Sequence, residues 1–265
     1  MSIALTVQRR QPDSLNIKHI FNFVFEVLIM KKLAFFALSA FAAAAMAAGP
    51  VSPSAITISG TSNQTANITG TTVSNKSNTD NTAMQNLASN AGNIQIKGRS
   101  DQTVRTQGSS LFNEAVDRDD WANQNISSNA GKVEVAKSGT SDQQTTLNNT
   151  TVSNKAKGND AEALQNLASN NGNGIMITGT SKQTVGGFSS TVSNTANGAH
   201  ARAVQNLSSN FGKVTIAGMS TQSTYLYSGS SVLNVAAGRN SHAIQNIASN
   251  DACDEPKDPC PNGCR

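Results

Sequence analysis

The octapeptide AVQNLSSN, residues 203–210, sets the organisation of this chain, because close copies of it occur five times. Each copy contains a Gln-Asn pair, and successive pairs are 39, 41, 40 and 40 residues apart. Self-similarity at a fixed period of this length is the signature of a repeat architecture. The glutamines of the five pairs are Gln85, Gln124, Gln165, Gln205 and Gln245.

The composition of the 265-residue chain excludes a thick hydrophobic core. Aromatic residues make up 5% and charged residues 14% of the sequence, whereas Gly, Ser, Thr, Asn and Gln dominate it. A chain this poor in large apolar side chains either stays disordered or folds as a thin layer that is repeated many times. The formal net charge of +4 is too small to decide for disorder.

Each unit reads as a series of short strands. It opens with an alternating β-branched stretch such as Ile56-Thr57-Ile58, and a turn glycine such as Gly60 follows. A Ser-x-Gln segment, an apolar-x-Asn segment, a variable polar loop and the octapeptide come next. We therefore predict an all-β fold, a β-solenoid of stacked strand–turn–strand arches with five repeats of about 40 residues. Each repeat forms either one rung or two rungs of about 20 residues, and the sequence leaves both open.

The octapeptide is predicted to be a strand with one inner face. Alternate positions read Ala, Gln, Leu or Ile, and Ser in all five copies, so this uniform set is expected to face the interior. An amphipathic helix is the alternative, but the Ser-Asn ends and the many Thr and Val residues favour a strand. The intervening, more variable positions begin at Met84, Asn123, Leu164, Val204 and Ile244.

A buried glutamine is costly unless its amide is hydrogen-bonded. Copies of one amide stacked in register, about 4.8 Å apart, satisfy one another as a ladder. We predict three such ladders, one from each recurring amide position. The Ser-x-Gln ladder comprises Gln64, Gln102, Gln143, Gln183 and Gln222, the apolar-x-Asn ladder comprises Asn75, Asn113, Asn154, Asn194 and Asn234, and the octapeptide ladder comprises Gln85, Gln124, Gln165, Gln205 and Gln245.

The N-terminal residues read as a secretory leader with an extension in front. Residues 30–48 combine the positive Met30-Lys31-Lys32, an Ala- and Phe-rich apolar run, and a small-residue cleavage site, which are the parts of a signal peptide. Residues 1–29 read as translated upstream sequence or as a long n-region. A membrane anchor that also uses residues 20–29 is the alternative, but Glu26 and the lysine pair interrupt it.

After the leader, a repeat domain at residues 49–250 is followed by a Cys- and Pro-rich tail at residues 251–265. The tail holds all three cysteines, and an exported protein is expected to form one disulfide among them and to keep one free thiol. Metal binding is a weaker alternative, because no histidine lies nearby. The cysteines are Cys253, Cys260 and Cys264. The five units are expected at residues 52–91, 92–130, 131–171, 172–210 and 211–250.

No pattern of catalytic residues appears. The histidines His19, His200 and His242 are scattered, and near-equal units offer no unique site with perturbed groups. Positive and negative residues nearly balance after the leader, so no basic patch suggests nucleic-acid binding. We expect no enzyme activity, no cofactor, no small-molecule substrate and no nucleic-acid partner.

The loop at residues 117–121 in the second unit departs most from the repeat pattern. It carries Asp117, Arg118, Asp119 and Asp120 together with the only tryptophan, Trp121. Acidic residues spaced in this way are able to bind calcium. We favour a solvated loop whose charges discourage lateral association.

The repeats resemble those of secreted bacterial functional amyloids. Their Ser, Gln, Asn and Gln positions are similar to the layout of curlin repeats, and QNLSSNFGKVTIAG at residues 205–218 resembles more closely the repeats of the major Fap fibre subunit of pseudomonads. The resemblance covers residues 56–250. It implies an exported subunit that polymerises outside the cell into biofilm or adhesive fibres. Its partners would be further copies of itself and an outer-membrane export or nucleator protein.

The residues by themselves lead to nearly the same hypothesis. A stack of identical rungs leaves two open β edges, and an uncapped edge recruits another chain. The expected protein is thus a secreted, cell-surface structural subunit of an amyloid-like fibre. The alternatives are a monomeric β-solenoid adhesin whose outer loops bind a surface or glycan, an ice-binding variant of it, and a chain that stays disordered until a fibre end templates its folding.

Overall fold

The computed structural model describes residues 55–116, 118–172, 175–212 and 214–250. Every element in this part of the chain is a β-strand, and all of them belong to one structural unit, Pro53–Arg265. No helix among the described residues is long and apolar enough to cross a membrane. The expected leader and the cysteine tail lie outside the described residues.

Five classes of strand recur in chain order, and we call them A to E. The A strands are β1 (Ala55–Ile58), β6 (Asn93–Ile96), β11 (Val133–Val135), β16 (Met176–Ile177) and β20 (Thr215–Ile216). The B strands are β2 (Thr61–Thr69), β7 (Arg99–Gln107), β12 (Thr140–Asn148), β17 (Thr180–Phe188) and β21 (Met219–Leu226). The C strands are β3 (Thr72–Asn78), β8 (Ser110–Val116), β13 (Thr151–Gly158), β18 (Thr191–Gly198) and β22 (Ser231–Gly238).

The D strands contain the Gln-Asn pairs, and the E strands are two-residue segments that begin at the last residue of the octapeptide. The D strands are β4 (Ala83–Leu87), β9 (Ala122–Ile126), β14 (Glu162–Leu167), β19 (Arg202–Leu207) and β23 (His242–Ile247). The E strands are β5 (Asn90–Ala91), β10 (Asn129–Ala130) and β15 (Asn170–Asn171).

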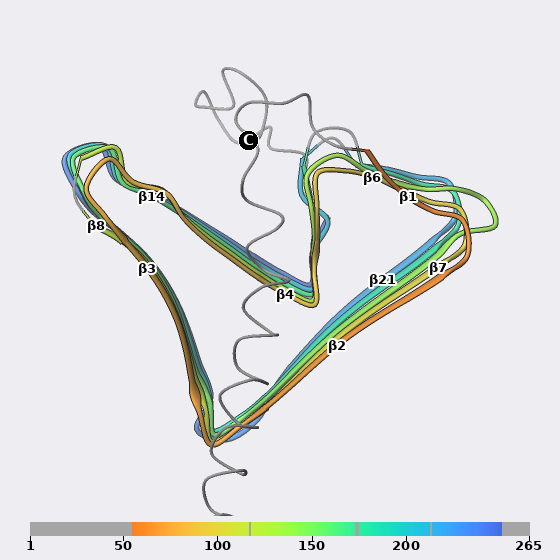
Figure 1. Ribbon diagram of the computed structural model, residues 1–265, viewed down its shortest axis with the longest axis horizontal. Helices are drawn as coiled ribbons and strands as arrows, with labels where there is room; N and C mark the ends of the chain where they lie inside the picture. The colour runs from red at the N-terminus through yellow and green to blue at the C-terminus, as the bar shows by residue number, and fades with distance from the viewer. Residues whose placement is uncertain (1–54, 117, 173–174, 213, 251–265) are drawn as a thin grey trace, which may run out of the picture. The chain divides into compact units, whose positions relative to one another are not determined.

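Each strand pairs in parallel with the strand of its own class in the neighbouring turn, which makes five parallel sheets. The register places equivalent residues opposite one another, so that Gln143 faces both Gln102 and Gln183. Strands of one class from successive turns therefore run side by side, as β2, β7 and β21 do in Figure 1. The predicted β-solenoid is confirmed, and one rung is a full turn of about 40 residues, not 20.

The octapeptide does not form one continuous strand. The D strand ends at its leucine or isoleucine, and the next residue takes a left-handed conformation, for example Ala168 with φ 46° and Ser208 with φ 49°. The strand alternation therefore does not run on to the following serine, because a left-handed residue breaks the two-residue period of a strand. That serine is nonetheless buried, as expected, at Ser128, Ser169 and Ser209. The last three residues of the octapeptide make a corner.

A second corner of similar chemistry joins the B and C strands. A left-handed residue occupies it in the first four turns, such as Gly108 with φ 57° and Asn149 with φ 48°. At both corners the next hydroxyl donates back to the backbone: Ser109 Oγ to the Gln107 carbonyl and Ser128 Oγ to the Ile126 carbonyl, each at 2.9 Å. Two similar corners in one turn explain why the repeat also reads as two arches of about 20 residues.

The core is a set of apolar columns that run through the stack. The largest column joins residues of the B, C and D strands, including Val104, Leu111 and Leu167. A second column consists only of alanines from the C and D strands and the loop between them, among them Ala115, Ala156 and Ala163. A third joins the isoleucines and valines of the A strands. Each fully buried large side chain contributes about 1.5–3 kcal/mol, so repetition compensates for the thinness of each layer.

Glycines stack on one another where the backbones of neighbouring turns approach most closely. Gly172 has φ +135°, and a Cβ placed on it would lie 1.9 Å from the Gly131 carbonyl oxygen. Gly186, within the B strand β17, has open space at its Cβ position. The two positions therefore differ in whether a methyl group can be accommodated and in backbone conformation, because only Gly172 has a positive φ.

We expect Gly172→Ala to lower the free energy of unfolding by about 2–4 kcal/mol, through strain and overlap with backbone. Gly186→Ala is the matched control and should leave stability unchanged or raise it by about 0.5 kcal/mol. Urea unfolding followed by circular dichroism measures both. Equal effects of the two substitutions would contradict the close stacking of the glycines.

Candidate functional site: amide ladders and the ends of the stack

The octapeptide glutamines form a continuous amide ladder. Gln124 Nε2 donates to Gln85 Oε1 at 2.8 Å, and Gln165 Nε2 donates to Gln124 Oε1 at 2.8 Å. The chain of bonds continues from Gln205 to Gln165 at 2.7 Å and from Gln245 to Gln205 at 2.6 Å. Every donor points toward the preceding turn, so the ladder has a direction along the stack.

The C-strand asparagines form a second ladder that runs in the opposite direction. Asn113 Nδ2 donates to Asn154 Oδ1 at 2.8 Å, and Asn154 Nδ2 donates to Asn194 Oδ1 at 2.9 Å. Asn75 donates to Asn113 at 2.7 Å, and Asn194 donates to Asn234 at 2.9 Å, so donors here point toward the following turn.

These two ladders also tie the C and D strands together. Asn154 Nδ2 lies 3.0 Å from the carbonyl oxygens of Ala122 and Leu164 on D strands, and Gln165 Nε2 lies 3.1 Å from the Ser193 carbonyl on a C strand. Because small alanine side chains form the column between these strands, the C and D backbones lie close enough for an Asn or Gln side chain to bridge them. Each buried amide therefore bonds both its own column and the facing strand.

The Ser-x-Gln glutamines lie in register but bond a different partner from the expected one. Gln102 Nε2 donates to Asn129 Oδ1 at 2.9 Å, and Gln143 Nε2 donates to Asn170 Oδ1 at 2.9 Å. The partners of these two glutamines are the asparagines that end the octapeptide, whereas Gln183 Nε2 donates to Ser181 Oγ at 2.9 Å. The Oε1 atoms of Gln102 and Gln143 have no hydrogen-bond partner among the described residues, so this column is less well satisfied than the other two.

Sequence reasoning missed two further asparagine columns. Asn166 Nδ2 donates to Asn125 Oδ1 at 2.8 Å on the opposite face of the D strand from the glutamines. At the corner, Asn129 Nδ2 donates to Asn170 Oδ1 at 3.1 Å. Both asparagines occur in all five octapeptides, and this invariance is the sequence signal that could have predicted the two columns. The two columns were missed because the octapeptide was assumed to have a single inner face.

The D strand is in fact buried on both faces in the middle of the stack. Leu164, assigned to the variable outer set, is 3% exposed and packs with Val204 and Phe211. The assignment of one inner face to the octapeptide was therefore wrong for these turns. A strand position keeps the same residue in every turn because its side chain joins an amide ladder. Burial by itself does not require the same residue in every turn.

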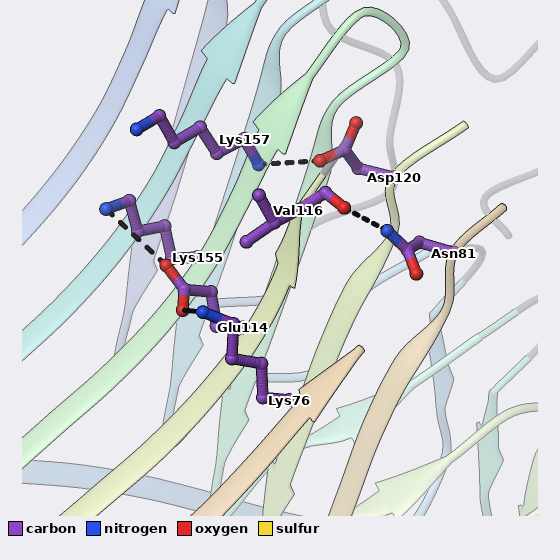
Figure 2. A network of polar contacts seen from close by, with 7 residues as sticks. All are labelled: Lys76, Asn81, Glu114, Val116, Asp120, Lys155 and Lys157. Carbon is purple, nitrogen blue, oxygen red and sulfur yellow. Dashed lines mark hydrogen bonds and ion pairs between the residues drawn. The ribbon is translucent and has the colours of Figure 1, made fainter. Parts of the chain in front are cut away.

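The outer side chains of neighbouring turns form ion pairs and local contacts. Figure 2 shows Glu114 between Lys76 and Lys155, with oxygen-to-nitrogen distances of 3.2 and 3.7 Å. In the charged loop of the second turn, Arg118 and Asp119 are exposed, but Asp120 is buried and accepts a hydrogen bond from the Lys157 amide at 2.9 Å. The expectation of a fully solvated loop was therefore wrong at Asp120.

Among the described residues, no group of three or more His, Cys, Asp or Glu side chains is placed so that it could hold a metal ion. Of the histidines named above, His200 shares a hydrogen bond with Asp160 of the preceding turn, and His242 lies on the exposed D strand of the fifth turn. That hydrogen bond lowers the pKa of the exposed Asp160 carboxyl from its ordinary value.

The two ends of the stack differ in exposed apolar surface. Inward-facing residues of the fifth turn have no described turn above them, and Ile216, Leu226 and Ile247 are 38%, 41% and 39% exposed. Their first-turn counterparts Ile58 and Ile68 are only 8% and 9% exposed. Within the described residues, β21 has β17 as its single strand neighbour, and β2 likewise has only β7.

In comparisons with known proteins, no protein-family model, no curated protein and no solved structure matches the chain.

We expect Asn154→Ala to lower the free energy of unfolding by about 2 kcal/mol, because it removes the side-chain donor to buried carbonyl groups of two D strands and interrupts the asparagine ladder. Asn197→Ala makes the same chemical change at an exposed C-strand position and should stay within about 0.5 kcal/mol of the unmodified protein. Urea unfolding compares the pair. Similar losses in both variants would show that the ladder contributes no more than surface asparagines do.

The Asp160 carboxyl should titrate below its ordinary pKa, and His200→Ala should raise that pKa because the hydrogen bond is lost. Asn240→Ala, one turn further along the stack, should leave it unchanged. Side-chain carboxyl chemical shifts recorded against pH measure the value. An Asp160 pKa that does not respond to His200→Ala would contradict the pairing between the two turns.

Proposed function

We propose that the protein is an exported structural subunit that self-assembles into extracellular amyloid-like fibres of a biofilm matrix or an adhesive surface. Export rests on the leader at residues 30–48, and assembly rests on the repeat domain. Copies of the same chain are its main partner, and an outer-membrane export or nucleator protein is a second partner.

The continuity of the amide ladders through all five turns carries this proposal. Gln85 to Gln245 and Asn75 to Asn234 form directional chains of hydrogen bonds that stop only where the described turns stop. A further turn of the same kind would prolong both chains and cover the apolar side chains at the end of the stack. Parallel, in-register stacking with amide ladders is the arrangement of cross-β fibres.

The second candidate is a monomeric β-solenoid adhesin, and it needs displayed loops that differ from turn to turn. The loop with the strongest charge, in the second turn, has its Asp120 carboxylate buried against the Lys157 amide. A side chain engaged in this way is less suited to bind a glycan than an exposed one. The fibre therefore has more support than the adhesin.

We expect the purified chain without its leader, residues 48–265, to form unbranched fibres without any added protein. Electron microscopy should show the fibres, and X-ray diffraction from aligned samples should give a spacing of about 4.7–4.8 Å along the fibre axis, which is the distance between paired strands.

A variant in which Cys253, Cys260 and Cys264 are all replaced by Ser should also form fibres, because the repeat domain contains no cysteine. Protein that remains monomeric at high concentration, in both forms, would overturn the proposal. If that monomer binds glycans or surfaces, the adhesin replaces the fibre subunit.

A further inference from the structure

From the two different ends of the stack we infer that copies join head to tail, the fifth turn of one copy receiving the first turn of the next. This inference rests on the proposed function and assigns the surface on each copy that makes the junction. Its partner is a second copy of this chain.

The fifth turn is the most apolar surface of the described chain. Most exposed large apolar side chains belong to it, including Tyr225, Leu226 and Leu233. Residues 214–238 contain no Asp, Glu, Lys or Arg, whereas the second and third turns carry several charges on the same strands. An exposed apolar patch of this kind marks an interaction surface. A stacked turn would cover the inward-facing members of this surface, Ile216, Leu226 and Ile247, without enclosing an unpaired charge. Tyr225 and Leu233 lie at outward register positions, on the side of the stack.

The first turn matches this surface in register and, like it, carries little charge. Its A, B and C strands carry a single charged residue, Lys76, which points outward. Continuing the observed register by one turn places Ile58, Ile68 and Leu87 of the next copy over Ile216, Leu226 and Ile247. The apolar columns of the core would thus run unbroken from one copy into the next.

Leu226 is the clearest element of this junction. Its methyl group lies 3.0 Å from the position of a Cβ on Gly187, so it fills space that the glycine of the fourth turn leaves open. Its other side is exposed. The corresponding residue at the other end, Ile68, belongs to the buried B, C and D column and would cover that exposed side.

The direction of the amide ladders distinguishes this junction from a symmetric one. At the fifth turn, the glutamine ladder ends on an acceptor, Gln245 Oε1, and the asparagine ladder ends on a donor, Asn234 Nδ2. The first turn supplies the opposite groups, Gln85 Nε2 and Asn75 Oδ1. Two fifth turns stacked with like strands opposed would instead place acceptor against acceptor and donor against donor.

Chemical crosslinking tests the junction directly. Lys76 and Val235 occupy equivalent outward positions in the first and fifth turns, so a head-to-tail junction places them on adjacent strands, about 4.8 Å apart. We would introduce Lys76→Cys and Val235→Cys separately, each with the three tail cysteines replaced by Ser. Fibres grown from each variant, and from a 1:1 mixture, would be treated with a short bismaleimide.

The expected result is a crosslinked dimer in the mixture and none in fibres of either variant alone. Asn63→Cys, exposed on the first-turn B strand, replaces Lys76→Cys as the control and should give no crosslink with Val235→Cys. Crosslinking of Val235→Cys with itself would instead establish fifth-turn to fifth-turn contact and overturn the inference. Fibres with the cross-β spacing but no crosslink in the mixture would overturn it too, while the proposed fibre function would stand. If the unmodified protein forms no fibres, both fail.

A pair of single substitutions tests the same surface by loss of assembly. Leu226→Asp places a charge in the junction and should raise the concentration needed for assembly about tenfold or more. Met176→Asp is the matched control, because Met176 is 42% exposed but points outward from the fourth turn. It should assemble as the unmodified protein does. Circular dichroism verifies that both variants keep their strands, and unchanged assembly of Leu226→Asp would contradict the inference.

Discussion

The structure depends on one constraint: a buried amide must find its hydrogen-bond partners in the turns next to it and in the facing strand. Asn154 illustrates it, since its single Nδ2 group lies within bonding distance of two D-strand carbonyls and of Asn194. A slip of one residue in one turn would leave such groups unsatisfied, at a cost of about 1–3 kcal/mol each. The ladders therefore hold the register that the apolar columns alone would specify only weakly.

The same constraint explains how so polar a chain keeps a folded interior. Alanines between the C and D strands bring the two backbones close together, and the asparagines and glutamines then reach across the gap. Between the B strands and the octapeptide corner, Gln102 instead bonds the side chain of Asn129. Large apolar residues are needed only in a few columns, because polar ladders occupy the remaining interior positions.

Repetition inside the stack contrasts with variation on its outside. Glu114 between two lysines, and Asp160 with His200, join particular turns by charge, whereas the fifth turn has no charge on its first three strands. The inside makes every turn a suitable neighbour for every other. The outside and the ends make the turns different.

The sequence by itself determined the repeat, the all-β class, the positions of the strands and most of the buried amides, because a period of about 40 residues and strand alternation are local patterns. Only the tertiary structure decided that one rung is a whole turn, that Ala168 and its equivalents make a corner, and that Gln102 bonds Asn129. It also showed that both faces of β14 are buried. These features depend on which segments meet across the turn. Such contacts join side chains that are far apart in sequence and come together only when the turn closes, so local sequence patterns do not reveal them.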